Sequence, residues 1–181
     1  LLSIDQGTTS SRSILFDLKG NKIFSSQFEF QQIFPNSGWV EHNPEEIWKV
    51  TLKTIKEAIR KSKNLKSKII SIGITNQRET TILWDKNTGK PIYNAIVWQD
   101  RRTQKICENL KKRKLENSFR KKTGLFIDPY FSATKVKWIL DNVSLSKKLI
   151  KNKRLMFGTI DTFLIWRLTD KTNHFTDATN A

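Results

Sequence analysis

The densest group of side chains suited to chemistry is the string DQGTTSSR at residues 5–12, which follows an apolar stretch. A carboxylate leaving a buried strand, here Asp5, can hold Mg²⁺ through water, because this ion retains much of its hydration shell. Gly7 lets the backbone approach a phosphate, and the Thr and Ser residues supply N–H and O–H donors. Arg12 adds a fixed positive charge that can face phosphate oxygens. The string has the makeup of a phosphate site, but small polar residues also form ordinary hairpin turns, and the Walker pattern is missing.

A second polar string, GITNQRETT at residues 73–81, also comes at the end of an apolar run. Ligands of open α/β sheets collect at such strand ends. Arg78 and Glu79 place donors and an acceptor side by side, which suits a small neutral polyol with several hydroxyl groups. The alternative, which these residues alone favour, is a solvated ion pair at the surface.

Two aromatic residues are candidates for the wall of a binding site. Trp98 ends an apolar run in the string WQDRRT, and an indole face fits the carbon chain of a polyol. Tyr130 lies in the string DPYFS, where its hydroxyl can face a ligand. Packing in the core is the more common role for a Trp at a strand end and for a lone Tyr, so the residue types alone favour that interpretation.

The elements that must position these groups begin with a hairpin over residues 1–17 and a third strand over residues 22–31 with period-two patterning. Residues 43–63 predict a helix, with Asn43 as its cap and proline at the first helical position. One apolar stripe is expected to be buried on this helix. Its members are Trp48, Leu52, Ile55 and Ile59.

The rest of the chain alternates between segments with the period of a strand and segments with the period of a helix. The expected strands cover residues 69–75, 80–84 and 92–98, and the expected helices cover residues 100–112, 132–142, 145–151 and 161–169. A loop is expected at residues 124–130. Three strands followed by alternating helices and strands predict one α/β domain, a mixed sheet with flanking helices.

Composition excludes several classes of protein. The chain has 181 residues, one cysteine and two histidines, so an internal disulfide is impossible and a four-ligand structural zinc site is excluded. No stretch approaches the ~20 apolar residues of a membrane span, and we expect a cytoplasmic protein. The net charge of +16 makes nucleic acid or another anionic molecule a candidate partner. Because most of the cations are scattered lysines, a solvated basic surface is the preferred interpretation.

Taken together, the polar strings resemble the glycerol kinase family of carbohydrate kinases. Six strings occur in the family's order and spacing, at residues 5–12, 38–42, 73–81, 98–103, 124–135 and 158–166. The resemblance runs over residues 1–181 without an evident gap. It implies two ribonuclease-H-like (actin-like ATPase) domains, of which this chain is most of the first, with the C-terminal domain absent.

The resemblance also implies roles for individual residues and a reaction. Asp5 would face Mg²⁺, and the ATP phosphates would be contacted by Thr8, Thr9, Ser10 and Arg12. The glycerol pocket would be formed by Arg78, Glu79, Trp98 and Tyr130. The implied reaction transfers the γ-phosphoryl group of ATP to a terminal hydroxyl of glycerol, giving glycerol 3-phosphate.

The resemblance places the general-base aspartate and the second domain beyond residue 181, so we expect these residues alone to be catalytically inactive. The family further implies a homo-oligomer. Two alternatives stay open: a kinase for another polyol or sugar, and a basic nucleic-acid-binding module on a ribonuclease-H-like sheet. The second would use the basic tracts at residues 111–114 and 147–154. A nuclease of that fold needs several clustered carboxylates, and only Asp5 is well placed.

Overall fold

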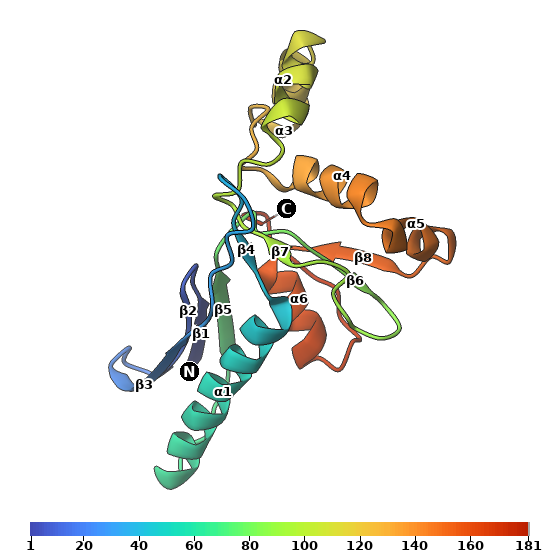
Figure 1. Cartoon of the computed structure of the whole chain (residues 1–181). Helices are drawn as coiled ribbons and strands as arrows, with labels where there is room; N and C mark the ends of the chain where they lie inside the picture. The colour runs from blue at the N-terminus through green and yellow to red at the C-terminus, as the bar shows by residue number, and fades with distance from the viewer. Residues whose placement is uncertain (181) are drawn as a thin grey trace.

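The hairpin at the start of the chain forms the centre of a four-stranded sheet in the computed structural model, which describes residues 1–180. The sheet has the order β3-β2-β1-β5. Its strands are β1 (Leu2–Gln6), β2 (Ser10–Phe16), β3 (Lys22–Glu29) and β5 (Ile72–Asn76). The first three are antiparallel neighbours, whereas β1 and β5 run parallel. The predicted mixed sheet is therefore confirmed (Figure 1).

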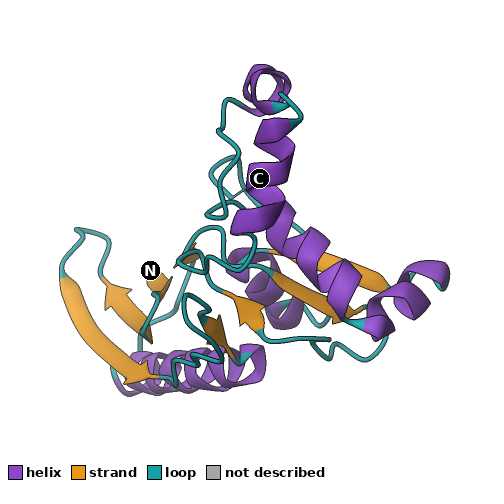
Figure 2. Ribbon diagram, turned by 45° about the horizontal axis from the view of Figure 1, so that its top comes forward, coloured by secondary structure: helices purple, strands orange, loops and turns teal. Residues whose placement is uncertain are grey.

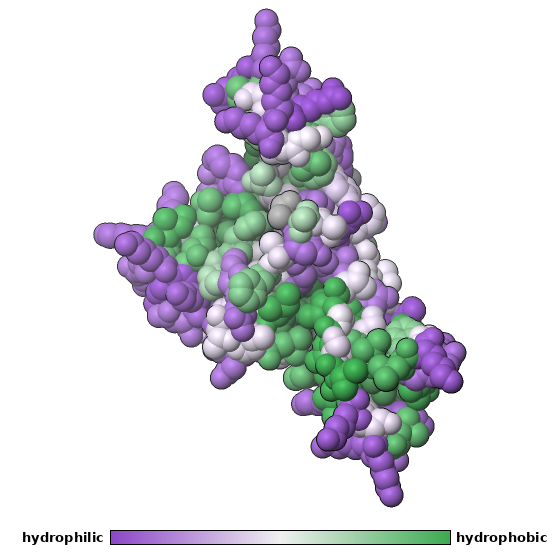
Figure 3. All heavy atoms as spheres, turned by 180° about the vertical axis from the view of Figure 1, so that it is seen from behind, coloured by the Kyte–Doolittle hydropathy of each residue, from purple (hydrophilic) through white to green (hydrophobic). Residues whose placement is uncertain are grey.

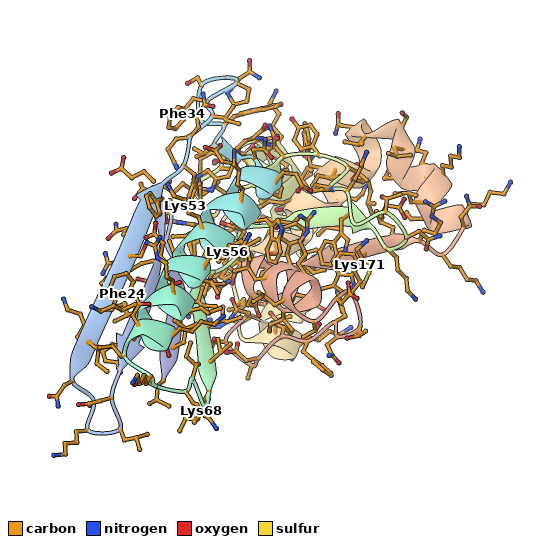
Figure 4. The ribbon with its side chains drawn as sticks, turned by 90° about the horizontal axis from the view of Figure 1, so that it is seen from below. Phe24, Phe34, Lys53, Lys56, Lys68 and Lys171 are labelled. Carbon is orange, nitrogen blue, oxygen red and sulfur yellow. The ribbon has the colours of Figure 1, made fainter. Side chains whose placement is uncertain are left out.

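Helix α1 (Pro44–Asn64) covers one face of this sheet (Figure 2). As predicted, Asn43 caps it, its side chain accepting a hydrogen bond from the Glu45 N–H at 2.9 Å. Lys53 and Lys56 of α1 are exposed (Figure 4). The Lys53 ammonium group lies 3.4 Å from the ring centroid of Phe28 on β3. The predicted helix and its polar side are therefore confirmed.

The predicted apolar stripe of α1 is wrong in part. Ile55 is buried, but Ile59 is 38% exposed, and Trp48 and Leu52 are only half-buried. The buried face instead includes Thr51 and Thr54. Their hydroxyls bond the Ser11 and Ser13 hydroxyls of β2 at 2.9 and 2.7 Å. Since the facing strand carries serines, the helix turns hydroxyl groups toward the sheet in place of the more apolar stripe.

Alternation along the strands places the polar groups of the first string on the opposite face. On β1, Leu2, Ile4 and Gln6 are buried, while Asp5 lies on the other face and is partly exposed. On β2, Arg12 alternates with the buried serines in the same way. The sheet thus presents a carboxylate and a guanidinium away from α1.

A second core lies beside this sheet, around Trp84 and Phe163, whose ring centroids are 5.4 Å apart. Two small antiparallel pairs surround it: β4 (Glu41–His42) with β7 (Ala95–Ile96), and β6 (Ile82–Asp85) with β8 (Leu155–Gly158). The flanking helices are α4 (Ser132–Asn142), α5 (Ser144–Lys151) and α6 (Ile160–Leu168). The expected strand over 92–98 is reduced to the short β7.

Helices α2 (Gln104–Lys112) and α3 (Glu116–Thr123) form an arm that projects from the body (Figure 1). Hydrophilic side chains cover this arm (Figure 3). Helix α3 was not predicted. Helix α2 starts four residues later than expected because buried Asp100 accepts hydrogen bonds from Val40 N and from the Arg102 side chain. Within residues 1–180, no helix combines the length and apolar character needed to cross a bilayer.

Candidate functional site

The two polar strings meet at one end of the sheet. Strands β1 and β5 are parallel, so their carboxyl ends lie at the same edge. Gln77 N donates to Gln6 O at 2.8 Å, and Gln77 Nε2 donates to Gly7 O at 3.1 Å. The turn after β1 and the residues after β5 are therefore directly joined by hydrogen bonds.

Asp5 and Arg12 are cross-strand partners on the exposed face of the sheet. Arg12 Nε donates to Gln27 Oε1 at 2.8 Å, and Gln27 Nε2 donates to Ser10 Oγ at 2.8 Å, so β3 orients the guanidinium. Within residues 1–180, the Asp5 carboxylate accepts no hydrogen bond and enters no ion pair. It is available to a ligand or a hydrated cation.

The turn at residues 7–9 is held by its carbonyl groups. Thr8 O accepts from Gln32 Nε2 at 3.1 Å, and Thr9 O accepts from Phe30 N at 3.2 Å. None of the hydrogen bonds among the described residues uses the N–H of Thr8 or Thr9. A Cβ at Gly7 would lie 3.3 Å from Ser10 O, which is tight. The turn thus presents backbone donors of the kind that bind phosphate.

Trp98 joins this turn to the second group of predicted residues. Its Nε1 donates to Thr8 Oγ1 at 3.1 Å, and its ring packs edge-on against Tyr130 with 5.9 Å between ring centroids. Its backbone N–H donates to Thr80 Oγ1 at 3.3 Å. Trp98 is half-buried, so one part of the indole packs while another stays accessible.

Arg78 and Glu79 do not form the surface ion pair that was the alternative. The Glu79 carboxylate accepts hydrogen bonds from Ser132 N at 3.3 Å and Ser132 Oγ at 3.2 Å, at the start of α4. Arg78 is exposed, and its guanidinium has no hydrogen-bond or ion-pair partner in the part of the chain that is described. The structure therefore leaves Arg78 free for a ligand and holds Glu79 in place.

A buried polar network supports the site, and no pattern in the sequence beyond residue type predicts it. His42 Nδ1 lies 3.3 Å from Gln77 Nε2, and His42 Nε2 lies 2.7 Å from Gln32 Oε1. With Gln32 accepting and Gln77 donating, these partners assign the Nε2–H tautomer. Burial lowers the pKa of His42 to about 4, so the ring is neutral. The network fixes the turn and the end of β5 together.

One of the predicted site residues, Glu79, lies at the edge of a cavity. A hollow of about 560 Å³ borders Glu79 and is lined also by Phe131, Ser132, Thr162 and His174. Among residues 1–180, no three His, Cys, Asp or Glu side chains are grouped as metal ligands. Asp5 is thus suited to a hydrated ion whose other ligands come from outside the chain.

Comparison with known proteins gives consistent matches over the whole chain. The model for the FGGY family of carbohydrate kinases, N-terminal domain, matches residues 1–181. Curated proteins named glycerol kinase from Marinomonas sp. (strain MWYL1) and Petrotoga mobilis are 59% and 58% identical over 181 residues. The chain spans 37% and 36% of their lengths.

Solved structures agree with this result. The glycerol kinase of Plasmodium falciparum with ADP matches 99% of this chain with a TM-score of 0.94 and 41% identity, over 36% of its own length. A xylulose kinase from Rhodospirillum rubrum, 18% identical with a TM-score of 0.83 over 92% of this chain and 34% of its own, shares the fold alone. The expected actin-like mixed sheet with flanking helices is confirmed.

Proposed function

Because the chain belongs to the FGGY family of carbohydrate kinases, we propose that the complete protein transfers the γ-phosphoryl group of MgATP to a terminal hydroxyl of glycerol. Residues 1–181 are then most of the N-terminal domain of a two-domain kinase. The observation that carries this proposal is the hydrogen bond between Trp98 and Thr8, because it joins a phosphate-binding turn to a polyol-binding group. The relatives named glycerol kinase support glycerol as the acceptor.

On the nucleotide side, the ATP phosphates contact the turn after β1 and the guanidinium beside it. The contacts come from Thr8, Thr9, Ser10 and Arg12. Support comes from the unused N–H groups of the turn and from the orientation of Arg12 by Gln27. Asp5 holds Mg²⁺ through water, which fits a carboxylate that has no hydrogen-bond or ion-pair partner among residues 1–180. The ion, when bound, neutralises charge on the phosphate oxygens.

On the acceptor side, glycerol lies against the Trp98 indole and is bound by Arg78, Glu79 and Tyr130. The free guanidinium donates to hydroxyl oxygens, while the carboxylate accepts hydroxyl hydrogens. A site that hydrogen-bonds each hydroxyl can reject an analogue lacking one by as much as ~10⁴-fold.

These residues contribute alignment and charge stabilisation. Phosphoryl transfer passes through a loose transition state with the attacking and leaving oxygens in line, so little covalent chemistry is asked of the protein. Fixing the acceptor hydroxyl against the γ-phosphorus can supply ~7–11 kcal/mol of the barrier. The link through Trp98 keeps the two halves of the site at a constant distance.

The general base is proposed to lie outside residues 1–181. The carboxylates near the acceptor are already engaged: Glu79 with Ser132, Asp100 with Arg102, and Asp128 with Arg101 at 3.2 Å. Asp5 is assigned to the metal ion. As the family resemblance implies, an aspartate from the remaining chain takes the hydroxyl proton, so residues 1–181 alone are inactive.

The test is to follow label from [γ-³²P]ATP into product, using the complete protein and residues 1–181 in parallel. Glycerol 3-phosphate from the complete protein alone is expected. Faster phosphorylation of erythritol or a pentulose would show that glycerol is not the preferred acceptor. Absence of transfer to any polyol or sugar would refute the proposed kinase activity.

Three further properties belong to the same proposal. The protein acts in the cytoplasm and as a homo-oligomer, as the family resemblance implies. It does not bind nucleic acid specifically, since the lysines of α1 and α5 that supply much of the charge are exposed and scattered. Heparin retention that disappears at moderate salt, without selectivity among oligonucleotides, is the expected outcome.

A further inference from the structure

Lys135 is a fully buried lysine that none of the proposed contacts uses. It lies in the first turns of α4 and is 0% exposed, whereas Lys137, two residues further on, is exposed. Its ammonium group donates to the carbonyl oxygen of Tyr130 and lies 3.5 Å from the carbonyl oxygen of Glu79. One side chain thus contacts the backbone of two residues that are 51 positions apart.

Burial of this ammonium is unfavourable, so its position requires an explanation. Desolvation lowers the pKa of Lys135 to about 8, although four acidic groups nearby raise it. These are the carboxyl groups of Glu79, Asp100 and Asp128 and the thiol of Cys107. An apolar side chain of similar length would fill the same space without that cost, because it has no charged group to remove from water. What lysine offers at this position, and an apolar side chain does not, is the hydrogen-bond donors of its ammonium group.

The two carbonyl groups belong to segments that are distant in the sequence and that the fold brings together at the start of α4. Glu79 has a φ of 65°, in the left-handed region that non-glycine residues seldom occupy. In this conformation its carbonyl oxygen accepts from Ser132 Oγ at 3.0 Å as well as facing Lys135. Tyr130 is held from the other side, where its N–H donates to Asp128 Oδ1 at 2.8 Å.

We propose that Lys135 is a positioning residue of the acceptor site: its ammonium group ties the backbone of Glu79 to that of Tyr130 and so fixes the spacing between the carboxylate and the phenol. This inference rests on the proposed function for its kinetic consequence, but the tie itself is a property of the fold. Because Lys135 is fully buried, we assign it no contact with either substrate.

The kinetic test compares Lys135→Met with Lys137→Met in the complete protein. Both substitutions remove an ammonium group from α4, but only the first removes the tie. Lys135→Met is expected to raise KM for glycerol about tenfold or more, with KM for ATP changed less than about twofold. Lys137→Met should change neither. An equal rise in both KM values, or no rise in a folded variant, would overturn the positioning role.

A second measurement is independent of activity. Amide hydrogen exchange in Lys135→Met is expected to accelerate about tenfold or more within residues 76–81 and 128–132, relative to Lys137→Met. Unchanged exchange in both segments would refute the tie even if the protein proved not to phosphorylate glycerol. Faster exchange without kinase activity would reject the proposed function and keep the tie.

A third variant keeps the question decidable if Lys135→Met fails to fold. Lys135→Gln keeps a neutral amide donor group on a side chain that is one bond shorter, so its reach allows contact with one of the two carbonyl groups. It is expected to give an intermediate KM for glycerol and faster exchange in one of the two segments. If Lys135→Gln matches the unmodified protein in both measurements, the proposal is wrong.

Discussion

Trp98 Nε1 donates a hydrogen bond to Thr8 Oγ1 at 3.1 Å, although the two residues are 90 positions apart in the chain. Thr8 lies in the turn after β1, and Trp98 follows β7 and packs against Tyr130. The nucleotide side and the acceptor side of the proposed site are therefore in direct contact, and each should sense changes in the other.

This contact predicts a non-additive pair of substitutions. Trp98→Phe keeps an aromatic ring and removes the donor, while Thr8→Val keeps the shape and removes the acceptor. Each is expected to lower kcat/KM by about 3–10-fold, the effect of losing one neutral hydrogen bond. The double variant should be little worse than either single variant, with a coupling of about 1 kcal/mol. Effects that simply multiply would show that the hydrogen bond carries no coupling.

Arg78→Ala should weaken acceptor binding selectively. Its guanidinium has no partner among residues 1–180, so removing it should leave the fold intact. A hydrogen bond to a charged group contributes about 1.5–3 kcal/mol, which predicts a rise in KM for glycerol of about 10–150-fold. KM for ATP should change far less. The matched control is Arg60→Ala on the exposed side of α1, and equal effects of Arg78→Ala on both KM values would remove Arg78 from the acceptor site.

Asp5→Asn should act on turnover. The substitution keeps the size of the side chain but removes the charge that is proposed to hold the hydrated ion. Because a bound metal ion supplies several kcal/mol of charge stabilisation, kcat at saturating glycerol should fall about 10²-fold or more. KM for glycerol should stay close to that of the unmodified protein. Asp17→Asn, a carboxylate in the exposed turn between β2 and β3, is the control. Unchanged turnover in Asp5→Asn would make Asp5 a structural residue.

The buried network predicts how stability depends on pH. The pKa of His42 is lowered from 6.5 to about 4 in the folded chain because the ring is desolvated. The unfolded chain therefore binds more protons between these values, and this contribution, present above pH 6.5, is lost as pH falls toward 4. The loss amounts to about 3 kcal/mol.

Urea unfolding at a series of pH values measures this effect. Carboxylates titrate in the same range, so the quantity of interest is the difference between the unmodified protein and His42→Gln. That difference should shrink as pH falls from 6.5 to 4. His174→Gln changes the exposed histidine and should not alter the slope of the free energy of unfolding against pH. A slope that is equal in the unmodified protein and in His42→Gln would contradict the assignment of a buried neutral ring.

Local signals in the sequence were sufficient for the elements that carry the first polar string. The hairpin follows from two short apolar runs around a polar turn, and α1 follows from Asn43 and Pro44 at its start. The order of β1 and β5 was not available from local patterns, because it depends on a parallel pairing between residues about 70 positions apart. The family resemblance implied a ribonuclease-H-like sheet, but the pairing of these two strands was not among the predictions.

The supporting residues were beyond sequence reasoning for a physical reason. Lys135 and Lys137 lie two positions apart on one helix, and the sequence alone does not distinguish them. In the structure Lys135 is buried and Lys137 is exposed. His42 has no predicted role of its own, because its partners Gln32 and Gln77 come from other segments. The burial of a polar group is decided by the partners that tertiary structure supplies, and those partners leave no local pattern.

The measurement that tests the central claim most directly is the binding of a compound that joins glycerol to adenosine through a chain of phosphates. If the turn at residues 7–9 and the group around Trp98 form one site, the complete protein should bind one such molecule per chain, about 10²-fold or more tighter than the nucleotide part alone. Both Asp5→Asn and Arg78→Ala should weaken it. Affinity no greater than that of the nucleotide part, or binding that is insensitive to Arg78→Ala, would contradict a shared site.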